Sequence, residues 1–459
     1  MLKRKLVLIL AFTVVLFGLT LYSYGGYGQN TAYPQGPVIG HSDRVLIVAP
    51  HPDDETIDNT GIIRYCIEKN IPVHVVIVTN GGDSVSTGEK RHNETLTAMS
   101  KLGLKSSAVT FLDYPEGLTF LFNRNWDYDK LYNESDGTSH ARNTFAYEPG
   151  APYCGASLEK ALENVIWQYQ PTIIIYPDPD DKNTDHWATS AFVNYAVNNM
   201  NYNCKEYEYP THAYSLWPYP RSYNPDDYLL PPAELVNQSQ WMVFPLTRHD
   251  ESLKYAAIKS YTSQISPDSS YLIAFVKKNE LFTVYPVLNV TMQNRTANFH
   301  SGSAFPPTIF NDPENDLIEG HTSLDNVNTL DDDLDAEDTA PMDLTAVGLE
   351  MDNNTTWISL KTRGNISNAL TYEFHVRTFR DDGDKRIDIQ AQNGTAHYTM
   401  VSQNSVESSL KIKTVFKKNG IIVGIPTDLI NNNKFMINVD ILTAQCAIDT
   451  TAWRTVNVV

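Results

Sequence analysis

Short apolar runs alternate with segments of helical hydrophobic spacing through the first part of the chain. Candidate strands lie at residues 44–49, 73–78, 109–112, 172–176 and 212–218, and candidate helices at 56–69, 89–102, 158–169, 185–198, 254–264 and 271–282. Gly103 follows the second helix and is expected to end it, because glycine readily adopts the left-handed conformation of a helix cap. This alternation predicts an α/β domain with a mostly parallel, Rossmann-like sheet that helices cover on both faces.

The alternation stops between residues 117 and 152, which are rich in Asn, Asp, Tyr and Gly. A connection of this length inside a compact domain is usually either functional or mobile. Two interpretations stay open: a lid on the substrate side of the sheet, or a disordered insertion.

The C-terminal part has a different pattern, in which short alternating runs are separated by polar turns such as Asn393-Gly394. The runs lie at residues 356–361, 370–376, 387–390, 396–401, 410–416, 421–425 and 435–442. Regular short strands with polar turns predict an all-β sandwich. Residues 312–343, which precede the runs, contain twelve acidic residues and no lysine or arginine. Three interpretations of this acidic segment stay open: a solvated linker, an edge of the sandwich that holds Ca²⁺, since oxygen-rich loops suit that ion, or a segment that only keeps the protein soluble.

The N-terminus has the pattern of a targeting segment. Lys3, Arg4 and Lys5 precede the uncharged run of 17 residues at 6–22, a length at the lower limit for spanning a bilayer. It is either a cleaved signal peptide or a retained membrane anchor, so we expect a secreted or extracytoplasmic membrane-anchored protein. The expected parts are a signal peptide or anchor at 1–28, the α/β domain at 29–300, an acidic linker or sandwich edge at 301–345, and a β-sandwich accessory domain at 346–459.

The net charge narrows the classes of binding partner, and the cysteines limit the disulfides that can form. The net charge of −19 argues against nucleic acids and anionic membrane surfaces, which attract basic proteins. No two of the four cysteines have CxxC spacing. Cys66 lies in an apolar helical pattern and is expected to be a buried thiol. Cys154 with Cys204 is the pairing we expect if a disulfide forms. The oligomeric state has no signature in the sequence.

The stretch most suggestive of chemistry directly follows the first candidate strand. His51 and Asp54 supply an imidazole and a carboxylate, both good zinc ligands, and Asp53 between them is left free to act as a base. Active sites of α/β folds lie just past the carboxyl ends of parallel strands. His186, which follows another such strand, is the best candidate for a third ligand. This pattern predicts a zinc hydrolase in which an activated water is the nucleophile.

At these residues the sequence resembles the LmbE-like, or PIG-L, zinc-dependent N-acetylglucosaminyl deacetylases, over residues 43–285. The similar segments are Pro50-His51-Pro52-Asp53-Asp54-Glu55, Arg91-His92-Asn93-Glu94, Leu112-Asp113-Tyr114-Pro115-Glu116-Gly117, Asp185-His186 and Lys254 through Gln264. The resemblance implies that His51, Asp54 and His186 bind zinc and that Asp53 is the general base. We further predict that Arg91 and Asp113 contact the substrate.

One position departs from the family's pattern. The second metal motif usually reads His-Pro-Asp-His, and Asn183 stands here where the first histidine would be. An asparagine can donate a hydrogen bond to an oxyanion but cannot deliver a proton. We therefore expect Asn183 to stabilise the oxyanion and Asp53 to do more of the proton transfer.

Each of these residues also has an ordinary structural interpretation. His51 would then be a helix-capping or core histidine, Asp54 would cap a helix, and His186 would be a surface histidine. Arg91 with Glu94 would form a surface ion pair. The leading functional hypothesis is an extracytoplasmic zinc-dependent deacetylase that acts on an N-acetylglucosamine-type sugar or glycan. The alternatives are a non-catalytic cell-surface glycan-binding protein with an inactive deacetylase-like site, and a hydrolase of another amide or ester.

Overall fold

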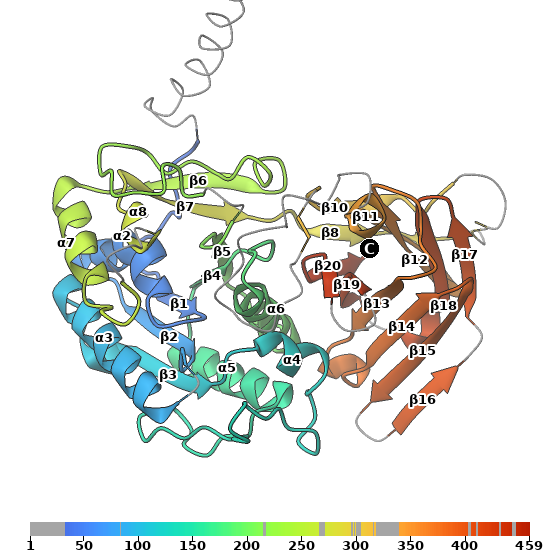
Figure 1. The fold of residues 1–459 in the computed structure, drawn as a ribbon, viewed down its shortest axis with the longest axis horizontal. Coiled ribbons are helices and arrows are strands. Elements are labelled where there is room, and N and C mark those ends of the chain that lie inside the picture. Colours follow the sequence, from blue (N-terminus) through green and yellow to red (C-terminus); the bar gives the residue numbers. More distant parts are fainter. Residues whose placement is uncertain are drawn as a thin grey trace, which may run out of the picture.

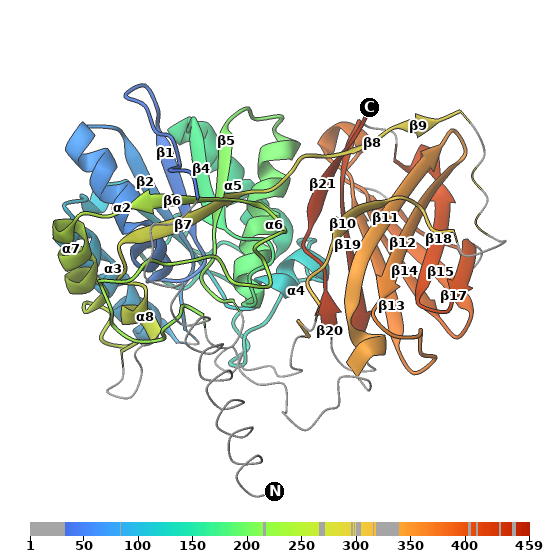
Figure 2. The same cartoon turned by 90° about the horizontal axis from the view of Figure 1, so that it is seen from above.

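The computed structural model describes residues 33–459 apart from 83, 214–216, 266–270, 295–296, 298, 300–303, 315, 318–338, 403–404, 410–411, 431–432 and 443–446. Within this part of the chain an α/β unit lies beside an all-β unit (Figure 1, Figure 2). The expected targeting segment at 1–28 and most of the acidic segment lie outside the described residues. Among the helices that are described, none combines the length and the apolar character needed to cross a membrane.

A seven-stranded mixed sheet forms the centre of the α/β unit, in the order β3-β2-β1-β4-β5-β7-β6. Its strands are β1 (Val45–Ala49), β2 (Val73–Thr79), β3 (Val109–Tyr114), β4 (Ile173–Pro177), β5 (Lys205–Tyr209), β6 (Gln240–Pro245) and β7 (Asn279–Val284). The first five strands in this order run parallel, whereas β7 is antiparallel to both β5 and β6. The chain order reverses between β1 and β4, and such a switch point is where α/β sheets bind ligands.

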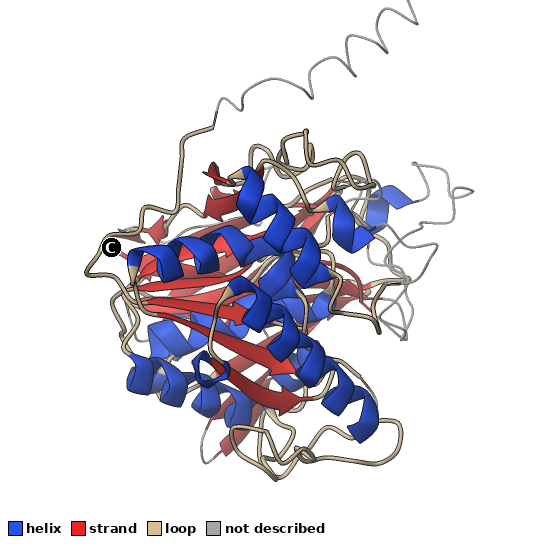
Figure 3. Cartoon of the chain, turned by 90° about the vertical axis from the view of Figure 1, so that its left-hand side faces the viewer, coloured by secondary structure: helices blue, strands red, loops and turns tan. Residues whose placement is uncertain are grey.

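Helices cover both faces of this sheet, as the predicted alternation requires (Figure 3). One face carries α2 (Asp54–Lys69), α3 (Val85–Leu102) and α7 (Arg248–Ile258), and the other carries α4 (Leu118–Asn123), α5 (Gly155–Tyr169) and α6 (Thr184–Asn199). All five residues of β1 are buried, as is usual for a strand that is covered on both sides. Gly103 ends α3 with a φ of 90°, so the predicted helix stop is confirmed.

Three expectations about single elements are wrong. Residues 271–282 form only the short helix α8 (Tyr271–Ala274) before β7 begins, because β7 pairs with strands on both sides. Helix α7 ends at Ile258 and does not reach residue 264. The described residues of the segment 212–218 form no strand. The fifth parallel strand is instead β5, whose alternating charged residues gave no apolar run to detect.

The long connection after β3 is packed against the core. It contains α4, and its buried residues include Trp126, Ala141 and Tyr153, which join the hydrophobic cluster beneath α5 and α6. The main-chain N–H and the side-chain amide of Asn143 both donate to Asp113 at the end of β3, over 3.0 and 2.7 Å. A disordered insertion is therefore wrong for this segment, and its role as a lid stays a prediction.

The second unit is the expected β-sandwich. A six-stranded sheet (β10-β11-β12-β18-β17, with β9 beside β11) faces an eight-stranded sheet (β16-β15-β14-β13-β19-β21-β8, with β20 beside β19). The bounds are β8 (Leu288–Val290), β9 (Met292–Gln293), β10 (Thr308–Asn311), β11 (Leu344–Asp352), β12 (Thr355–Thr362), β13 (Thr371–Arg377), β14 (Arg386–Gln392), β15 (Thr395–Ser402), β16 (Ser405–Ser409), β17 (Lys413–Lys417), β18 (Gly420–Pro426), β19 (Lys434–Leu442), β20 (Ala447–Thr450) and β21 (Arg454–Val458).

Alternate residues of both sheets fill one apolar core, for example Leu349 and Ile358 from one sheet and Phe374 and Val439 from the other. Strands β8 and β9 precede residue 300 and pair with β21 and β11 of this unit. The expected domain boundaries stay predictions.

The outer face of the eight-stranded sheet packs on α4 and α6 of the α/β unit. Trp453 lies edge-on to Phe122, with ring centroids 5.1 Å apart, and Phe379 lies 5.3 Å from Tyr195. Trp453 and Phe379 belong to the same buried cluster as the α5–α6 face of the parallel sheet. Because this cluster is continuous across the seam, the two units hold each other in place.

Cys66 is buried with a free thiol, as expected, and burial raises its pKa to about 12. The expected Cys154–Cys204 disulfide is absent, since both thiols are free. Cys154 precedes α5 at the carboxyl-end edge of the parallel strands, whereas Cys204 precedes β5 at the opposite edge. Cys446 lies outside the described residues.

Candidate metal centre

The switch point between β1 and β4 brings together two segments that are far apart in the sequence. His51 is the second residue after β1, and Asp54 is the first residue of α2. His186 is the third residue of α6, the helix that follows β4. Because β1 and β4 pair in parallel, both segments leave the sheet at the same edge. The sheet order therefore places the three predicted ligands side by side.

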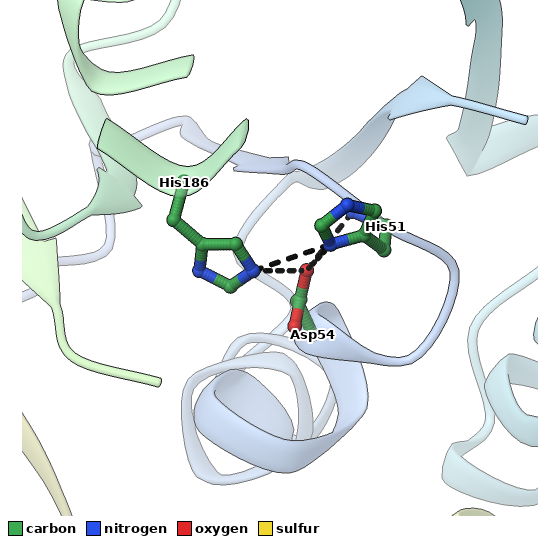
Figure 4. Close-up of side chains that lie close together, drawn as sticks. All are labelled: His51, Asp54 and His186. Atoms are coloured by element: carbon green, nitrogen blue, oxygen red, sulfur yellow. Dashed lines mark hydrogen bonds and ion pairs between the residues drawn. The ribbon is translucent and has the colours of Figure 1, made fainter. Parts of the chain in front are cut away.

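Three potential ligand atoms converge at this edge (Figure 4). Nδ1 of His51 lies 3.2 Å from Nε2 of His186, and Oδ2 of Asp54 lies 3.3 and 3.2 Å from these two nitrogens. Ligands bound to Zn²⁺ at its usual bond lengths in a tetrahedron stand roughly 3.3 Å apart. Two nitrogens and one carboxylate oxygen with this spacing fit a zinc ion and leave its fourth position open for water.

The centre is buried, and its surroundings favour the ionised form of its carboxylate. His186 is fully buried, whereas His51 keeps an exposure of 8%. Although burial raises the pKa of Asp54, His186 and His51 more than offset this effect and hold it well below its usual range. Asp54 thus offers a charged oxygen to a metal ion, and its Oδ2 accepts the backbone N–H of His51. It does not act as a helix cap.

Two further aspartates lie beside the other ring nitrogen of each histidine, the one that is not among the converging atoms. Oδ2 of Asp185 lies 3.4 Å from Nε2 of His51, and Oδ2 of Asp181 lies 3.3 Å from Nδ1 of His186. Backbone N–H groups fix both carboxylates, those of Gly117 and Leu118 on Asp185 and those of Asn183, Thr211 and His212 on Asp181. Such carboxylates set the tautomer and orientation of a ligating histidine. Asp181 and Asp185 lie in the short aspartate-rich stretch that precedes His186. The sequence gives no sign that these two aspartates, rather than the others in that stretch, contact the histidines.

Asp53 lies beside the ligands without being one of them. Its backbone φ of 142° is unusual for a residue with a side chain, and such strain concentrates at functional sites. Nη2 of Arg91 donates to Oδ2 of Asp53 over 3.2 Å and to the carbonyl of Pro52 over 2.9 Å. Burial raises the pKa of Asp53 to about 7, against the opposing effect of Arg91. A carboxylate with this pKa suits general acid–base chemistry near neutral pH.

The two predicted substrate-binding residues, Arg91 and Asp113, are hydrogen-bonded to other groups of the protein. Arg91 and Glu94 are both buried, so they are not a surface pair. The carboxylate of Glu94 accepts hydrogen bonds from Thr262 and Ser263. Arg91 donates hydrogen bonds to Asp53 and to backbone carbonyls of the neighbouring loops. The carboxylate of Asp113 accepts hydrogen bonds from Asn143, as described above. Substrate contacts of Arg91 and Asp113 stay predictions.

Asn183 caps α6, since its Oδ1 accepts the backbone N–H of Asp185 over 2.9 Å. The cap fixes the side-chain amide at the start of the helix that carries His186. His212, for which the sequence predicts no role, lies edge-on to His186 with ring centroids 4.7 Å apart. Burial and the charge of His186 lower the pKa of His212 to about 4, so its imidazole is neutral. It is a further candidate for contact with a ligand at the centre.

The described part of the acidic segment brings Asp312 and Asp316 close to Asp449. Nζ of Lys182 donates to Oδ2 of Asp316 over 2.7 Å, so an ammonium group of the protein already lies at this cluster. The remainder of the segment, 318–338, lies outside the described residues. The Ca²⁺ interpretation stays a prediction.

The comparisons with known proteins concern the same region. The family model described as PIG-L, GlcNAc-PI de-N-acetylase, matches residues 46–197. A search of curated proteins finds no match.

Among solved structures, Dbv21, the deacetylase of the A40926 pseudoaglycone, is 16% identical, with a TM-score of 0.36 over 52% of this chain and 96% of its own. The N,N'-diacetylchitobiose deacetylase from Pyrococcus horikoshii is 19% identical, with a TM-score of 0.32 over 49% and 72%. GalB, a 4-carboxy-2-hydroxymuconate hydratase from Pseudomonas putida KT2440, is 15% identical, with a TM-score of 0.32 over 51% and 82%. At residues 46–197, the part of the α/β unit that contains His51, Asp54 and His186, the chain carries a domain of the PIG-L, GlcNAc-PI de-N-acetylase family.

Proposed function

We propose that the protein is a zinc-dependent deacetylase that hydrolyses the N-acetyl amide of an N-acetylglucosamine-type sugar outside the cytoplasm. The observation that carries this proposal is the convergence of His51, Asp54 and His186 at zinc-ligand spacing, beside Asp53. The PIG-L domain supports the amide substrate. The basic N-terminus followed by an uncharged run supports the location.

In this mechanism the protein holds the amide carbonyl and a water molecule next to the three ligands. A bound zinc ion would polarise the carbonyl and lower the pKa of water. Asp53 accepts the proton of the attacking water as the C–O bond forms. It then returns that proton to the amine nitrogen as the C–N bond breaks, which releases acetate and the free amino sugar.

The surrounding residues prepare Asp53 for this task. Arg91 donates a hydrogen bond to the carboxylate of Asp53, and the backbone N–H of Asp53 donates to Oε2 of Glu55 over 3.0 Å. Asn183 has its oxygen committed to the helix cap, so its amide N–H groups are the donors available to a developing oxyanion. Held groups of this kind lower the barrier because they need not reorganise during the reaction.

The direct test is acetate release from a panel of N-acetylated sugars and glycans. The full chain is stripped with a chelator and assayed with and without added zinc. We expect acetate only from the zinc-loaded protein, and none from the His51→Ala/His186→Ala double variant. Full zinc occupancy without turnover on any N-acetyl sugar would contradict the proposal and favour a glycan-binding protein with an inactive site.

Replacing Arg91 by methionine is expected to shift the acid limb of the pH–rate profile to higher pH. The positive charge of Arg91 favours ionised Asp53, so its loss raises the pKa of Asp53 further above its ordinary value. The base works only when it is deprotonated, and activity should therefore be lost at a higher pH than in the wild type, by about one unit or more. Arg124→Met, at an exposed position after α4, is the control. An unchanged profile of kcat/KM against pH in Arg91→Met would contradict this coupling.

A further inference from the structure

A second group of metal-ligand side chains lies on the outer face of the eight-stranded sheet. Along β13, Tyr372, Phe374 and Val376 point into the sandwich core, so Glu373 and His375 lie on the opposite face. In the neighbouring strand β19, Asp440 is directly opposite Glu373 and Asn438 is opposite His375. In β14, on the other side, Gln390 is opposite Glu373 and Asp388 is opposite His375. Strand register therefore gathers these polar residues in one patch.

Three atoms of this patch converge as the ligands of the first centre do. Nε2 of His375 lies 3.1 Å from Oδ2 of Asp440 and 3.4 Å from Oε2 of Glu373. One ligand atom from each of the three residues lies within 4.8 Å of those from the other two. One imidazole nitrogen and two carboxylate oxygens at this spacing match a tetrahedral zinc ion, whose ligands stand roughly 3.3 Å apart.

Each of the three side chains is held by its other polar atom. Nδ1 of His375 lies 2.7 Å from Oδ1 of Asp388, the arrangement that fixes the tautomer of a ligating histidine. Thr450 donates its hydroxyl to Oδ1 of Asp440 over 2.5 Å, and Gln390 donates its amide to Oε1 of Glu373 over 2.6 Å. The remaining atoms, Nε2, Oδ2 and Oε2, are the ones that face the common centre.

Burial and charge make this patch unlike an ordinary surface cluster. His375 and Asp440 are buried, whereas the side chain of Glu373 keeps an exposure of 15%, which leaves a route for an ion to enter. Arg377 donates to Oδ1 of Asp388 over 2.8 Å. With a neutral imidazole on His375, a divalent cation together with Arg377 balances the charges of the three carboxylates.

A buried side-chain oxygen without a hydrogen-bond donor belongs to a residue of the same patch. Asn438 is fully buried, and its side-chain amide donates to the hydroxyl of Thr450 and the carbonyl of Thr451, but its Oδ1 has no hydrogen-bond partner. Its Cα is the register partner of His375. A buried acceptor without a donor is costly, and such a group often marks a position where a ligand or a water binds.

We propose that Glu373, His375 and Asp440 form a second zinc site, separate from the α/β centre, that cross-links β13 and β19 of the sandwich. The ring centroid of His375 lies 6.0 Å from that of Trp453, which packs on Phe122 across the seam between the units. Zinc bound here stiffens the face of the sandwich that supports the α/β unit. Its role is structural, and Asp388 is a positioning residue for His375.

The competing occupant is a proton. Burial by itself lowers the pKa of His375, but its hydrogen bonds with Asp388, Asp440 and Glu373 raise it well above the ordinary value. A protonated His375 would then replace the metal as the partner of the carboxylates. Zinc content and thermal stability separate the two cases, since only a metal site responds to chelation.

The test uses the full-length His51→Ala/His186→Ala double variant, in which the first centre is removed. After chelation and reloading with Zn²⁺, we expect about one tightly bound ion per chain by elemental analysis, and a higher Tm than in the zinc-free protein. Adding His375→Ala should remove both the ion and the rise in Tm. Asp388→Asn in the same background should weaken zinc affinity by about 10- to 100-fold. His249→Ala, at an exposed position on α7, is the control and should change neither.

Two results would overturn the proposal. One is a folded double variant that retains no zinc and has the same Tm with and without it, which would assign the patch to the proton. The other is zinc retained at full affinity after His375→Ala. If that variant does not fold, Glu373→Gln tests the same site at a partly exposed side chain, and unchanged zinc affinity there also overturns it. Activity is not the readout, so the result is independent of the deacetylase proposal.

Discussion

Replacing His186 by alanine is expected to abolish acetate release and to lower the zinc content by about one ion per chain. His186 is fully buried, and its Nε2 is one of the three atoms that converge at the switch point. Metal-ion catalysis supplies several kcal/mol of transition-state stabilisation, so the loss in kcat/KM should be about a thousandfold or more. Elemental analysis and acetate release, measured on the same preparation, give the two values together.

This substitution also leaves the buried carboxylates of Asp54 and Asp181 without their histidine. Circular dichroism must therefore show that the variant is folded. His51→Ala, on the other side of the centre, should have the same effect on zinc and activity. His74→Gln is the matched control, because His74 lies on β2 of the same sheet and its Nε2 contacts Thr110 at 2.8 Å. Substantial activity in folded His186→Ala would show that this centre does not perform the reaction.

Asp53→Asn is expected to lower kcat by about 10²- to 10⁴-fold while zinc binding is unchanged. The substitution keeps the shape of the side chain and an oxygen for Arg91 to contact, but removes the group that accepts the proton. Because the three converging ligand atoms belong to other residues, the metal content should equal that of the wild type. The separation of zinc content from turnover identifies a base that is not a ligand.

The neighbouring carboxylate provides a sharp comparison. Glu55 is also buried, but its oxygens accept hydrogen bonds from Tyr261, from Thr56 and from the backbone of Asp53. Glu55→Gln should consequently reduce kcat much less than Asp53→Asn, provided that the variant is folded. Asp53→Asn with nearly wild-type kcat, or a larger loss in Glu55→Gln, would show that the proton goes elsewhere.

The part of the site that lies within one short segment could be predicted from the sequence. His51, Asp53 and Asp54 are joined by a few covalent bonds across the start of α2, so their proximity follows from the turn between strand and helix. The positions of β1 and β4, which carry this segment and the one with His186, also follow from continuous apolar runs. Local patterns determined the sandwich in the same way, because two-residue alternation is a property of each strand by itself.

Other features depend on contacts between distant segments. β7 has an apolar pattern that also suits a helix, and it is a strand because β5 and β6 pair with it. The orientation of His186 by Asp181 depends on how the loop after β4 folds back, and Arg91 reaches Asp53 across 38 positions. These contacts have no fixed spacing in the sequence that would reveal them.

By itself, the sequence determined which side chains are of a type that can bind zinc and which kinds of sheet hold them. Tertiary structure decided that β1 lies next to β4, which brings His51 within 3.2 Å of His186 from 135 positions away. It also decided the register that sets His375 between Asp388 and Asp440 on three neighbouring strands. The physical reason is the same in both cases. Side-chain type and local periodicity are properties of each segment by itself. Strand order and register arise only when whole segments bury their apolar faces against one another.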